Sequence, residues 1–425
     1  MIIRNFQPVS TNSAKKDTLS IIDAGLGAAD PRLCLQKIIT NDHLVLPGRK
    51  IALAKYDHVF VIAIGKASGV MADTMDSLTR IDGGIVVVQD KFRLLNKKFK
   101  IIPAGHPLPN KNSLVAAKMI IQFLGKANPG DVVIFLISGG SSSLVALPDG
   151  ITLAEKQVTT DLLLKCGANI QEINCVRKHL SKIKGGKMLE YLRSDAVSLV
   201  MSDVVGNDLS SIASGMTYYD KTTFADAYKI LKKYHLEKLV PKSVLQHLSL
   251  GMKGTISETP KKVKIKNYVI ATNEDCLDAM KLRAKDLGYS VKLLSCMSGN
   301  VKDLGPKISK TFSGKKMNCT IFGGESTVVV TGKGKGGRNQ ELVLYTATDL
   351  SKKYSDVTVA SVGTDGIDGT TDCAGAIWQS NQKQDAIKQY LDKNDSHNFF
   401  KKYGGLIFTG PTGTNLMDIG LVLRK

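Results

Sequence analysis

Two cations in this 425-residue sequence stand beside glycines, where they could neutralise the charge of a bound phosphate or carboxylate. Lys66 comes directly after a glycine at the end of the apolar run 58–64. Arg338 ends the glycine- and lysine-rich part of the segment 323–342, where a helix is expected to begin. Glycine lets backbone N–H groups approach a ligand closely, and a helix N-terminus favours an anion. The segment 323–342 is therefore predicted to bind an anion.

A loop of small residues follows a second apolar run, 131–137, which predicts a buried strand. The loop residues are Ser138, Gly139, Gly140, Ser141, Ser142 and Ser143. Their backbone N–H groups and hydroxyls could hold a phosphate without a Walker loop. A plain strand–helix turn capped by serine is the alternative, but so many donors together favour the phosphate site. The hydrolase pattern Gly-x-Ser-x-Gly is absent, so we expect no serine nucleophile.

Carboxylates follow two further predicted strands. Asp203 and Asp208 lie in a loop after the run 196–201, and Asp365 lies in a glycine-rich loop after the run 357–362. Beside a bound phosphate, such carboxylates could hold Mg²⁺ or accept a hydroxyl proton. Asx turns explain the same residue types, so both interpretations stay open.

The stretch 174–187 is strongly basic and includes Arg177 and Lys184. A solvated helix face is the common explanation of such a stretch. Because it ends in Gly-Gly-Lys inside an α/β pattern, contact with an anion is an equally good explanation.

The segment 332–337 formally matches Gly-x-Gly-x-x-Gly, the fingerprint of dinucleotide-binding folds. It stands late in the chain rather than at the first strand–helix turn, and no acidic residue ends a strand about 20 residues further on. An NAD(P)H-dependent dehydrogenase is therefore kept as a rival hypothesis without being favoured.

The elements that must position these residues are strands and helices in alternation. Continuous apolar runs between helical patterns predict an α/β protein with a mostly parallel sheet, in which ligands bind at the carboxyl ends of strands. The polar stretch 251–266 is the predicted linker between domains at 1–250 and 267–425. Ile321 and Val328 are separated by an apparent tight turn, which predicts a mixed sheet in the second domain.

The composition excludes several classes of protein. The net charge is +20, but the lysines are spread along the chain, aromatic residues make up only 6%, and no nucleic-acid-binding motif is present. No apolar run approaches the roughly 20 residues that span a bilayer. The first residues do not lead into the apolar core of a signal peptide either, so we expect a cytoplasmic protein. Seven scattered cysteines without zinc spacing predict reduced thiols. We therefore expect neither a nucleic-acid nor a membrane partner.

Taken together, the motifs resemble those of the class II glycerate 2-kinases, which carry a C-terminal MOFRL-type domain. The matching segments occur in the family's order and cover nearly the whole chain: 64–67, 104–109, 137–144, 176–180, 202–204, 213–215, 323–327, 334–341, 363–369 and 410–415. The resemblance implies a Rossmann-like three-layer N-terminal domain, a smaller α/β C-terminal domain and an active site in the cleft between them. It leaves a homodimer open.

The reaction that this resemblance implies is transfer of phosphate from ATP to D-glycerate, giving 2-phosphoglycerate, with Mg²⁺ or another divalent cation. Some members are named hydroxypyruvate reductase, and that activity is the alternative. Lys66 and Arg338 match the family's two catalytic basic residues. Val205 and Asn207 stand where the family usually has proline and aspartate, which weakens a metal-binding role for this loop.

Each predicted site residue has a predicted role in this reaction. Phosphoryl transfer depends mostly on positioning and on neutralising charge, so Lys66 and Arg338 are expected to act on the transferring phosphate and to help bind substrate. Arg177 or Lys184 is expected to hold the glycerate carboxylate, and Asp203 to accept the hydroxyl proton. The predicted ATP-binding residues are Ser138, Gly139, Gly140, Ser141, Ser142, Gly336, Gly337 and Asn339. The predicted metal ligands are Asp203, Asp208 and Asp365.

Overall fold

The computed structural model describes residues 1–89, 97–380 and 386–425 and divides into two compact units. The N-terminal unit comprises Leu35–Met201 and Asn207–Ile270, and the C-terminal unit comprises Met1–Cys34, Ser202–Gly206 and Ala271–Lys425. This division differs from the predicted domains because the first 34 residues belong with the C-terminal unit.

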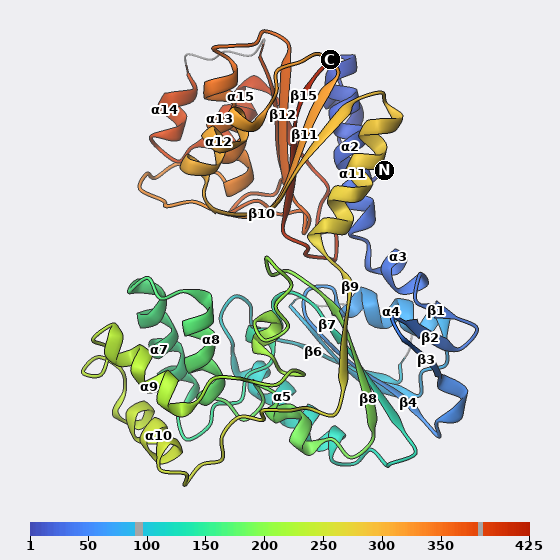
Figure 1. Ribbon diagram of the computed structural model, residues 1–425, viewed down its shortest axis with the longest axis vertical. Coiled ribbons are helices and arrows are strands. Elements are labelled where there is room, and N and C mark those ends of the chain that lie inside the picture. Colours follow the sequence, from blue (N-terminus) through green and yellow to red (C-terminus); the bar gives the residue numbers. More distant parts are fainter. Residues whose placement is uncertain (90–96, 381–385) are drawn as a thin grey trace. The chain divides into compact units, whose positions relative to one another are not determined.

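The N-terminal unit is built on a six-stranded sheet (Figure 1). Its strands are β4 (Val59–Ile64), β5 (Gly83–Val88), β6 (Phe99–Pro103), β7 (Val132–Ile137), β8 (Asp195–Met201) and β9 (Lys266–Ala271). Their order is β6-β5-β4-β7-β8-β9, and β6 through β8 run parallel. This is the order of a Rossmann fold, with its topological switch between β4 and β7. The predicted parallel sheet is confirmed.

Helices cover both faces of this sheet, as the predicted three-layer arrangement requires. Figure 1 shows α4 (Ser68–Leu78) and α5 (Lys111–Leu124) on opposite faces. A separate helical cluster has its own apolar core, which includes Leu163, Val176 and Phe224. Its helices are α7 (Leu153–Lys165), α8 (Ile170–His179), α9 (Phe224–Lys233) and α10 (Lys242–Met252). The remaining elements are α3 (Pro31–Gln36), α6 (Ser141–Leu144) and a small antiparallel sheet of β1 (Ile39–Thr40), β2 (His43–Leu46) and β3 (Arg49–Ala52).

The stretch 251–266, predicted as a linker, is held against the N-terminal unit. The Glu258 carboxylate lies 2.8 Å from Nε2 of the buried His179. Thr259 is buried and donates a hydrogen bond of 3.2 Å to Asp220. Most of this stretch therefore belongs to the first unit, and the sequence misled because polar residues that bond to a helical cluster look like solvated linker residues.

The C-terminal unit contains the predicted mixed sheet. Its strands are β10 (Ser290–Asn300), β11 (Asn318–Thr327), β12 (Val357–Gly363), β13 (Gly375–Gln379), β14 (Leu406–Ile407) and β15 (Asp418–Arg424), in the order β10-β11-β15-β12-β13-β14. Only the β10–β11 pair is parallel among these described strands. The predicted tight turn between Ile321 and Val328 is wrong, since β11 is one strand. Gly324, with φ of 143°, lets it pass Met297, whose carbonyl oxygen would lie 2.0 Å from an added Cβ.

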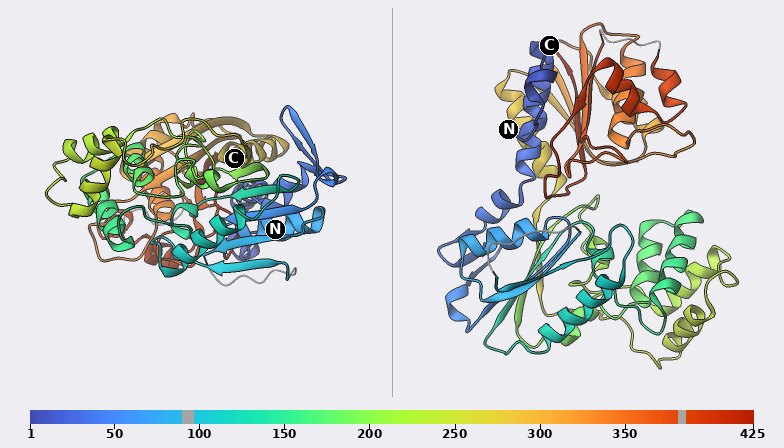
Figure 2. Two further views of the ribbon diagram at one scale, coloured as in Figure 1. Left: turned by 90° about the horizontal axis from the view of Figure 1, so that it is seen from below. Right: turned by 180° about the vertical axis from the view of Figure 1, so that it is seen from behind.

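Two helical layers enclose this second sheet (Figures 1 and 2). One face is covered by α2 (Ser13–Ala28) and α11 (Asn273–Asp286), which lie side by side. The other face carries α12 (Val301–Thr311), α13 (Arg338–Leu350), α14 (Ile387–Leu391) and α15 (Ser396–Tyr403), around a core that includes Trp378. The short α1 (Phe6–Val9) precedes α2. No helix in the part of the chain that the structure describes is long and apolar enough to cross a bilayer.

Candidate active site

In the structure, the loop that contains Lys66 contacts the loop 138–143 at the switch between β4 and β7. The Lys66 N–H donates to the Gly139 carbonyl at 2.8 Å, and the Ala67 N–H donates to Oγ of Ser138 at 3.1 Å. Gly65 has φ of 130°, and a Cβ there would lie 2.1 Å from Ser138 Oγ. Since ligands of such folds bind beyond the carboxyl ends of the strands at this switch, these loops form the candidate active site.

The donors of this loop are its backbone N–H groups rather than its hydroxyls. Ser141 Oγ donates to the Ile64 carbonyl at 2.8 Å, and Ser143 Oγ donates to the Pro107 carbonyl at 2.6 Å. By contrast, no described acceptor takes the N–H groups of residues 139–142. Gly140 has φ of 83°, and a Cβ there would lie 2.9 Å from Cδ2 of His106. We call residues 139–142 the N–H cradle, because free backbone donors on successive residues are suited to an oxyanion.

Ser142 ties this cradle to the stretch 174–187. Lys184 donates from Nζ to the Ser142 carbonyl at 2.8 Å. The Ser142 and Ser214 hydroxyls are 2.7 Å apart, and Ser214 donates onward to Oδ1 of Asn174 at 2.9 Å. The predicted substrate-binding stretch therefore lies directly against the predicted phosphate loop.

Most of the cations in this stretch are buried rather than exposed on a helix face. Lys178 forms an ion pair of 3.2 Å with the buried Asp220. Lys184 is 0% exposed, and its burial lowers its pKa well below the ordinary value. Arg177 is half-buried, and burial lowers its pKa to about 10. The solvated-face interpretation is therefore wrong for these residues.

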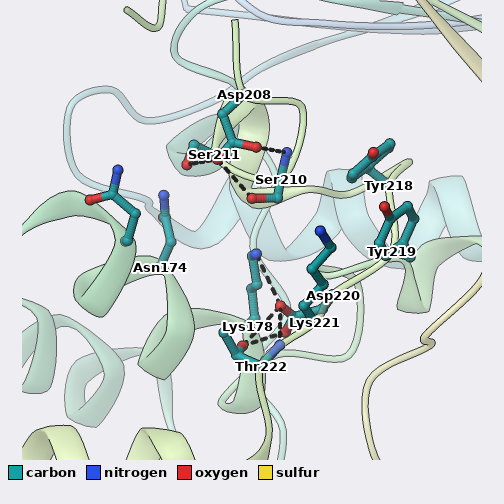
Figure 3. Close-up of a pocket in the computed structure, with 11 residues that line it drawn as sticks. Asn174, Lys178, Asp208, Ser210, Ser211, Tyr218, Tyr219, Asp220, Lys221 and Thr222 are labelled. Atoms are coloured by element: carbon teal, nitrogen blue, oxygen red, sulfur yellow. Dashed lines mark hydrogen bonds and ion pairs between the residues drawn. The ribbon is translucent and has the colours of Figure 1, made fainter. Parts of the chain in front are cut away.

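A cavity of about 210 Å³ is lined in part by residues of α8 (Figure 3). Asn174, Lys178, Asp208, Tyr218 and Tyr219 are among its lining residues. The Asp208 carboxylate accepts hydrogen bonds from the backbone and hydroxyl of Ser210 and from the hydroxyl of Ser211. Burial alone would raise the pKa of Asp208, but these hydrogen bonds hold it below its ordinary value. Asp208 thus makes an Asx-type turn in the wall of the cavity.

Arg338, in the C-terminal unit, is oriented by a residue that the sequence analysis missed. Its Nε and one terminal nitrogen donate to the two oxygens of Asp418 at 2.7 and 2.8 Å. Burial acts to lower the pKa of Arg338, but the charge and hydrogen bonds of Asp418 outweigh it and raise that pKa. Asp365 also contributes its negative charge there. Because the fork is planar, this pair fixes the direction of the whole guanidinium.

The anion expected at the helix start beside Arg338 is a protein carboxylate. The buried Asp368 accepts the backbone N–H groups of Asn339 and Gln340, both at 2.9 Å, in the first turn of α13. A Cβ on Gly337 would lie 2.3 Å from Cγ of Asp368. The Asn339 side chain is also buried, donating to Asp418 and accepting from Ser361. Direct contact of Gly336, Gly337 and Asn339 with ATP remains a prediction.

The glycine loop before α13, residues 331–337, forms hydrogen bonds with other residues of the C-terminal unit. Its backbone N–H groups at Thr331 and Gly332 donate to Asn394, and that of Lys335 donates to Asp395. These N–H groups are therefore not available to an anion, whereas those of Gly336 and Gly337 have no acceptor among the described residues, so anion binding by this segment stays a prediction. The same bonds weaken the dehydrogenase hypothesis, since a dinucleotide fingerprint needs such groups for the pyrophosphate.

The predicted metal ligands are divided between the two units, and their binding of a metal ion stays a prediction. Asp203 and Asp365 belong to the C-terminal unit and Asp208 to the N-terminal unit. Among the described residues, no three His, Cys, Asp or Glu side chains are placed to hold a metal ion together.

Comparisons with known proteins identify the relatives of this chain. A family model described as "Domain of unknown function (DUF4147)" matches residues 17–249, and the MOFRL family model matches residues 318–418. A Pyrococcus horikoshii protein named glycerate 2-kinase is 38% identical, covering 95% of this chain and 96% of its own. The crystal structure of glycerate kinase from Thermotoga maritima gives a TM-score of 0.82 at 35% identity, covering 95% of this chain and 98% of that one.

A relative with a different name is also found: a putative hydroxypyruvate reductase from Agrobacterium vitis is 35% identical, covering 97% of this chain and 94% of its own. The three relatives thus match this chain nearly from end to end, and both family models fall within that match. The chain belongs to the glycerate 2-kinase family, in which a DUF4147 domain precedes a MOFRL domain.

Proposed function

We propose that this protein transfers a phosphate from ATP to the 2-hydroxyl of D-glycerate, giving 2-phosphoglycerate and ADP. The observation that carries the proposal is the N–H cradle at the switch between β4 and β7, which has free donors where a Rossmann fold binds its ligand. The names of the Pyrococcus and Thermotoga relatives support the same reaction. The rival reductase activity has no matching support in the structure, because the glycine loop it would use already donates to Asn394 and Asp395.

In the proposed mechanism, the ATP phosphates bind at the cradle and the first unit supplies one cation. Lys66 follows Gly65 at the end of β4, and its Cγ would lie 3.5 Å from a Cβ at Gly140, so its side chain passes over the cradle. From there its ammonium neutralises charge on the transferring phosphoryl group. Arg338 is the second proposed cation, and its pairing with Asp418 leaves the remaining N–H groups of a pre-oriented fork for the same charge.

The glycerate molecule needs a carboxylate site and a group that takes its hydroxyl proton. Arg177 and Lys184 are the proposed carboxylate ligands, and Asp203 is the proposed base. Mg²⁺, when bound with ATP, would neutralise phosphate charge. No step is assigned to a protein-held metal, since no three His, Cys, Asp or Glu side chains among the described residues are placed to hold one ion. All seven cysteines are free thiols, which supports a reducing compartment and hence a cytoplasmic location.

The proposal is tested by two parallel assays. The protein is incubated with D-glycerate and ATP/Mg²⁺, and ADP formation is followed; the phosphorus NMR spectrum of the product distinguishes 2-phosphoglycerate from 3-phosphoglycerate. In the second assay, hydroxypyruvate and NADH or NADPH replace these substrates, and absorbance is followed. ADP and 2-phosphoglycerate are the expected products. Nucleotide oxidation without any ADP formation would show that the reductase hypothesis is correct instead.

A further inference from the structure

Three cations lie close together beyond the N–H cradle, and one of them is buried without a partner. Lys156 is 5% exposed, and its Nζ has no hydrogen-bond partner among the residues that the structure describes. Its burial lowers its pKa to about 7, and the positive charges of Arg177 and Lys187 add to this effect. The pKa of Lys184 is also lowered, by its burial and by the positive charges of Arg177 and Lys156. We call Lys156, Arg177 and Lys184 the cation cluster.

One member of the cluster contacts the cradle directly, and the residue after Lys156 contacts a loop beside it. Lys184 reaches the carbonyl of Ser142, as described above. Next to Lys156 in α7, the side chain of Gln157 donates to the Pro109 carbonyl at 2.8 Å, and the Pro107 carbonyl accepts from Ser143. Lys184 therefore lies against the cradle, the positive charges of Arg177 and Lys156 act on it, and Arg177 is half-buried rather than enclosed.

No described acidic residue neutralises this cluster. The carboxylate of Asp149 lies 4.0 Å from the side-chain nitrogen of Lys187, and 3.9 Å from those of Lys182 and His247. The negative charge of Asp149 acts to raise the pKa of Lys187, but it is not among the charges that shift the pKa of Lys156 or of Lys184. A buried ammonium without a counter-ion is costly, so an evolved cluster of this kind calls for an anion from outside the chain.

We propose that Lys156 completes a subsite in which it, Arg177 and Lys184 receive the carboxylate of glycerate, and that Lys156 sets the preference for a carboxylate-bearing alcohol. This inference rests on the proposed function. A carboxylate is favoured over an ATP phosphate because the adjacent backbone donors already provide a phosphate site, whereas the planar Arg177 fork suits the two oxygens of a carboxylate. Lys156 becomes charged when the anion binds, so binding takes up a proton.

The test compares Lys156→Met with Lys156→Arg, and with Lys165→Met as a matched control. Lys165 is on the same helix, but its side chain is 73% exposed and pairs with Asp161. Binding of D-glycerate to the full-length protein is measured by calorimetry at pH 7 without nucleotide, and ATP binding is measured separately. Losing one charge-assisted contact should weaken D-glycerate binding roughly tenfold to a hundredfold in Lys156→Met. Lys156→Arg and Lys165→Met should stay within about threefold of the wild type, since each retains the charge at position 156.

Turnover with D-glycerate and with glycerol, which lacks the carboxylate, supplies a second readout. Lys156→Met should lower kcat/KM for D-glycerate and leave that for glycerol unchanged. Unaltered D-glycerate binding in a folded Lys156→Met protein overturns the inference, as does a loss confined to ATP binding, which would assign the anion to a phosphate. A wild type that forms ADP while this variant binds normally leaves the kinase proposal standing. A wild type that binds D-glycerate through Lys156 but forms no ADP overturns the kinase proposal alone.

Discussion

The charge of Arg338 is directed by a carboxylate 80 positions further along the chain. Asp418 is the first residue of β15, and the sheet brings it beside Gly324 on β11. Glycine spacing and a helix start identified Arg338 from the sequence, because those signals are local. Nothing local marks Asp418, since its pairing depends on which strands become neighbours. The same limit applies to Lys156, whose lack of a partner is a property of the folded cluster.

Arg338→Ala should reduce kcat for D-glycerate phosphorylation roughly a thousandfold, as loss of other cationic clamps does in phosphoryl transfer. The KM values should change much less, because the proposed interaction develops in the transition state. Steady-state ADP release measures both quantities. Arg338→Lys should recover only part of the rate, since an ammonium cannot form the two-point pair with Asp418.

A matched control for Arg338 lies in the same unit. Arg424 also pairs through Nε with an aspartate, at 2.8 Å to Asp356, but at the opposite end of β15. Arg424→Ala should keep kcat within about threefold of the wild type. Circular dichroism must show that the Arg338 variants are folded, because Asp418 loses its counter-ion in Arg338→Ala. A folded Arg338→Ala enzyme with more than a tenth of the normal kcat would exclude the catalytic role.

Lys156 should also make stability depend on pH in the absence of substrates. Its folded pKa of about 7 lies below the ordinary value of 10.5, so between these values the unfolded chain binds more protons than the folded one. The free energy of unfolding therefore rises with pH across this window. Relative to Lys156→Met, the wild type should gain about 3 kcal/mol between pH 7 and pH 9.5. Urea unfolding of both proteins at the two pH values measures the difference, and Lys165→Met should track the wild type. Parallel pH profiles for wild type and Lys156→Met would mean that Lys156 is charged in the free protein.

At the scale of elements, two glycine-rich loops look alike in sequence but differ in how their backbone N–H groups are hydrogen-bonded. The loop after β7 leaves the N–H groups of residues 139–142 free, whereas the loop before α13 donates those of Thr331, Gly332 and Lys335 to Asn394 and Asp395. Sequence reasoning placed the first loop correctly because a buried strand followed by small residues fixes its position at the sheet edge. It could not separate the second case, since glycine permits the approach of a ligand and of another chain segment equally well.

Substitution of one glycine in each loop should therefore have opposite effects. A Cβ at Gly332 would lie 2.1 Å from the Lys393 carbonyl oxygen, so Gly332→Ala should destabilise the protein by about 1–3 kcal/mol with ATP binding unchanged. Gly140→Ala must distort a residue with φ of 83° that touches His106, and should weaken ATP binding roughly tenfold or more. Thermal unfolding and ATP titration of each variant test this pair.

Gly27→Ala is the control for adding a methyl group, because nothing lies within 4 Å of a Cβ at this position in α2. It should leave ATP binding unchanged and should not lower stability. If Gly332→Ala abolished ATP binding in a protein of normal stability, the glycine loop would be a ligand site, as the sequence predicts for the segment 323–342.

At the scale of the whole molecule, sequence reasoning could predict the parallel sheet but not the path of the chain. Alternating strands and helices predicted a parallel α/β sheet, and β6-β5-β4-β7-β8-β9 is such a sheet. The N-terminal segment was assigned to the wrong partner because its amphipathic helix, α2, fits any apolar face of suitable size. In the structure Tyr289 donates to Asp17 at 2.8 Å, and Lys425 pairs with the same carboxylate at 2.7 Å.

Because α2 belongs to the C-terminal unit, a cavity at its buried face is predicted to destabilise that unit. Ile22 is 0% exposed on α2, which packs on α11 and on the sheet strands β12 and β15. Ile22→Ala should cost about 2–5 kcal/mol, the usual loss for a large-to-small change in a core. Leu33→Ala, from the same segment but 47% exposed, should change stability by less than about 0.5 kcal/mol.

Hydrogen exchange then distinguishes the two possible homes of this helix. If α2 is part of the C-terminal unit, Ile22→Ala should speed exchange of the amides in α11 and β15, because local opening reports the stability of the cooperative unit concerned. Amides in β4 and β7 should exchange as in the wild type, since no atom of the N-terminal core has lost a neighbour. The domain boundaries read from the sequence make the reverse prediction, with protection lost in β4 and β7 and kept in β15. One exchange experiment on a single substitution thus decides whether the first 34 residues fold with the sequence that follows them or with the sheet that ends the chain.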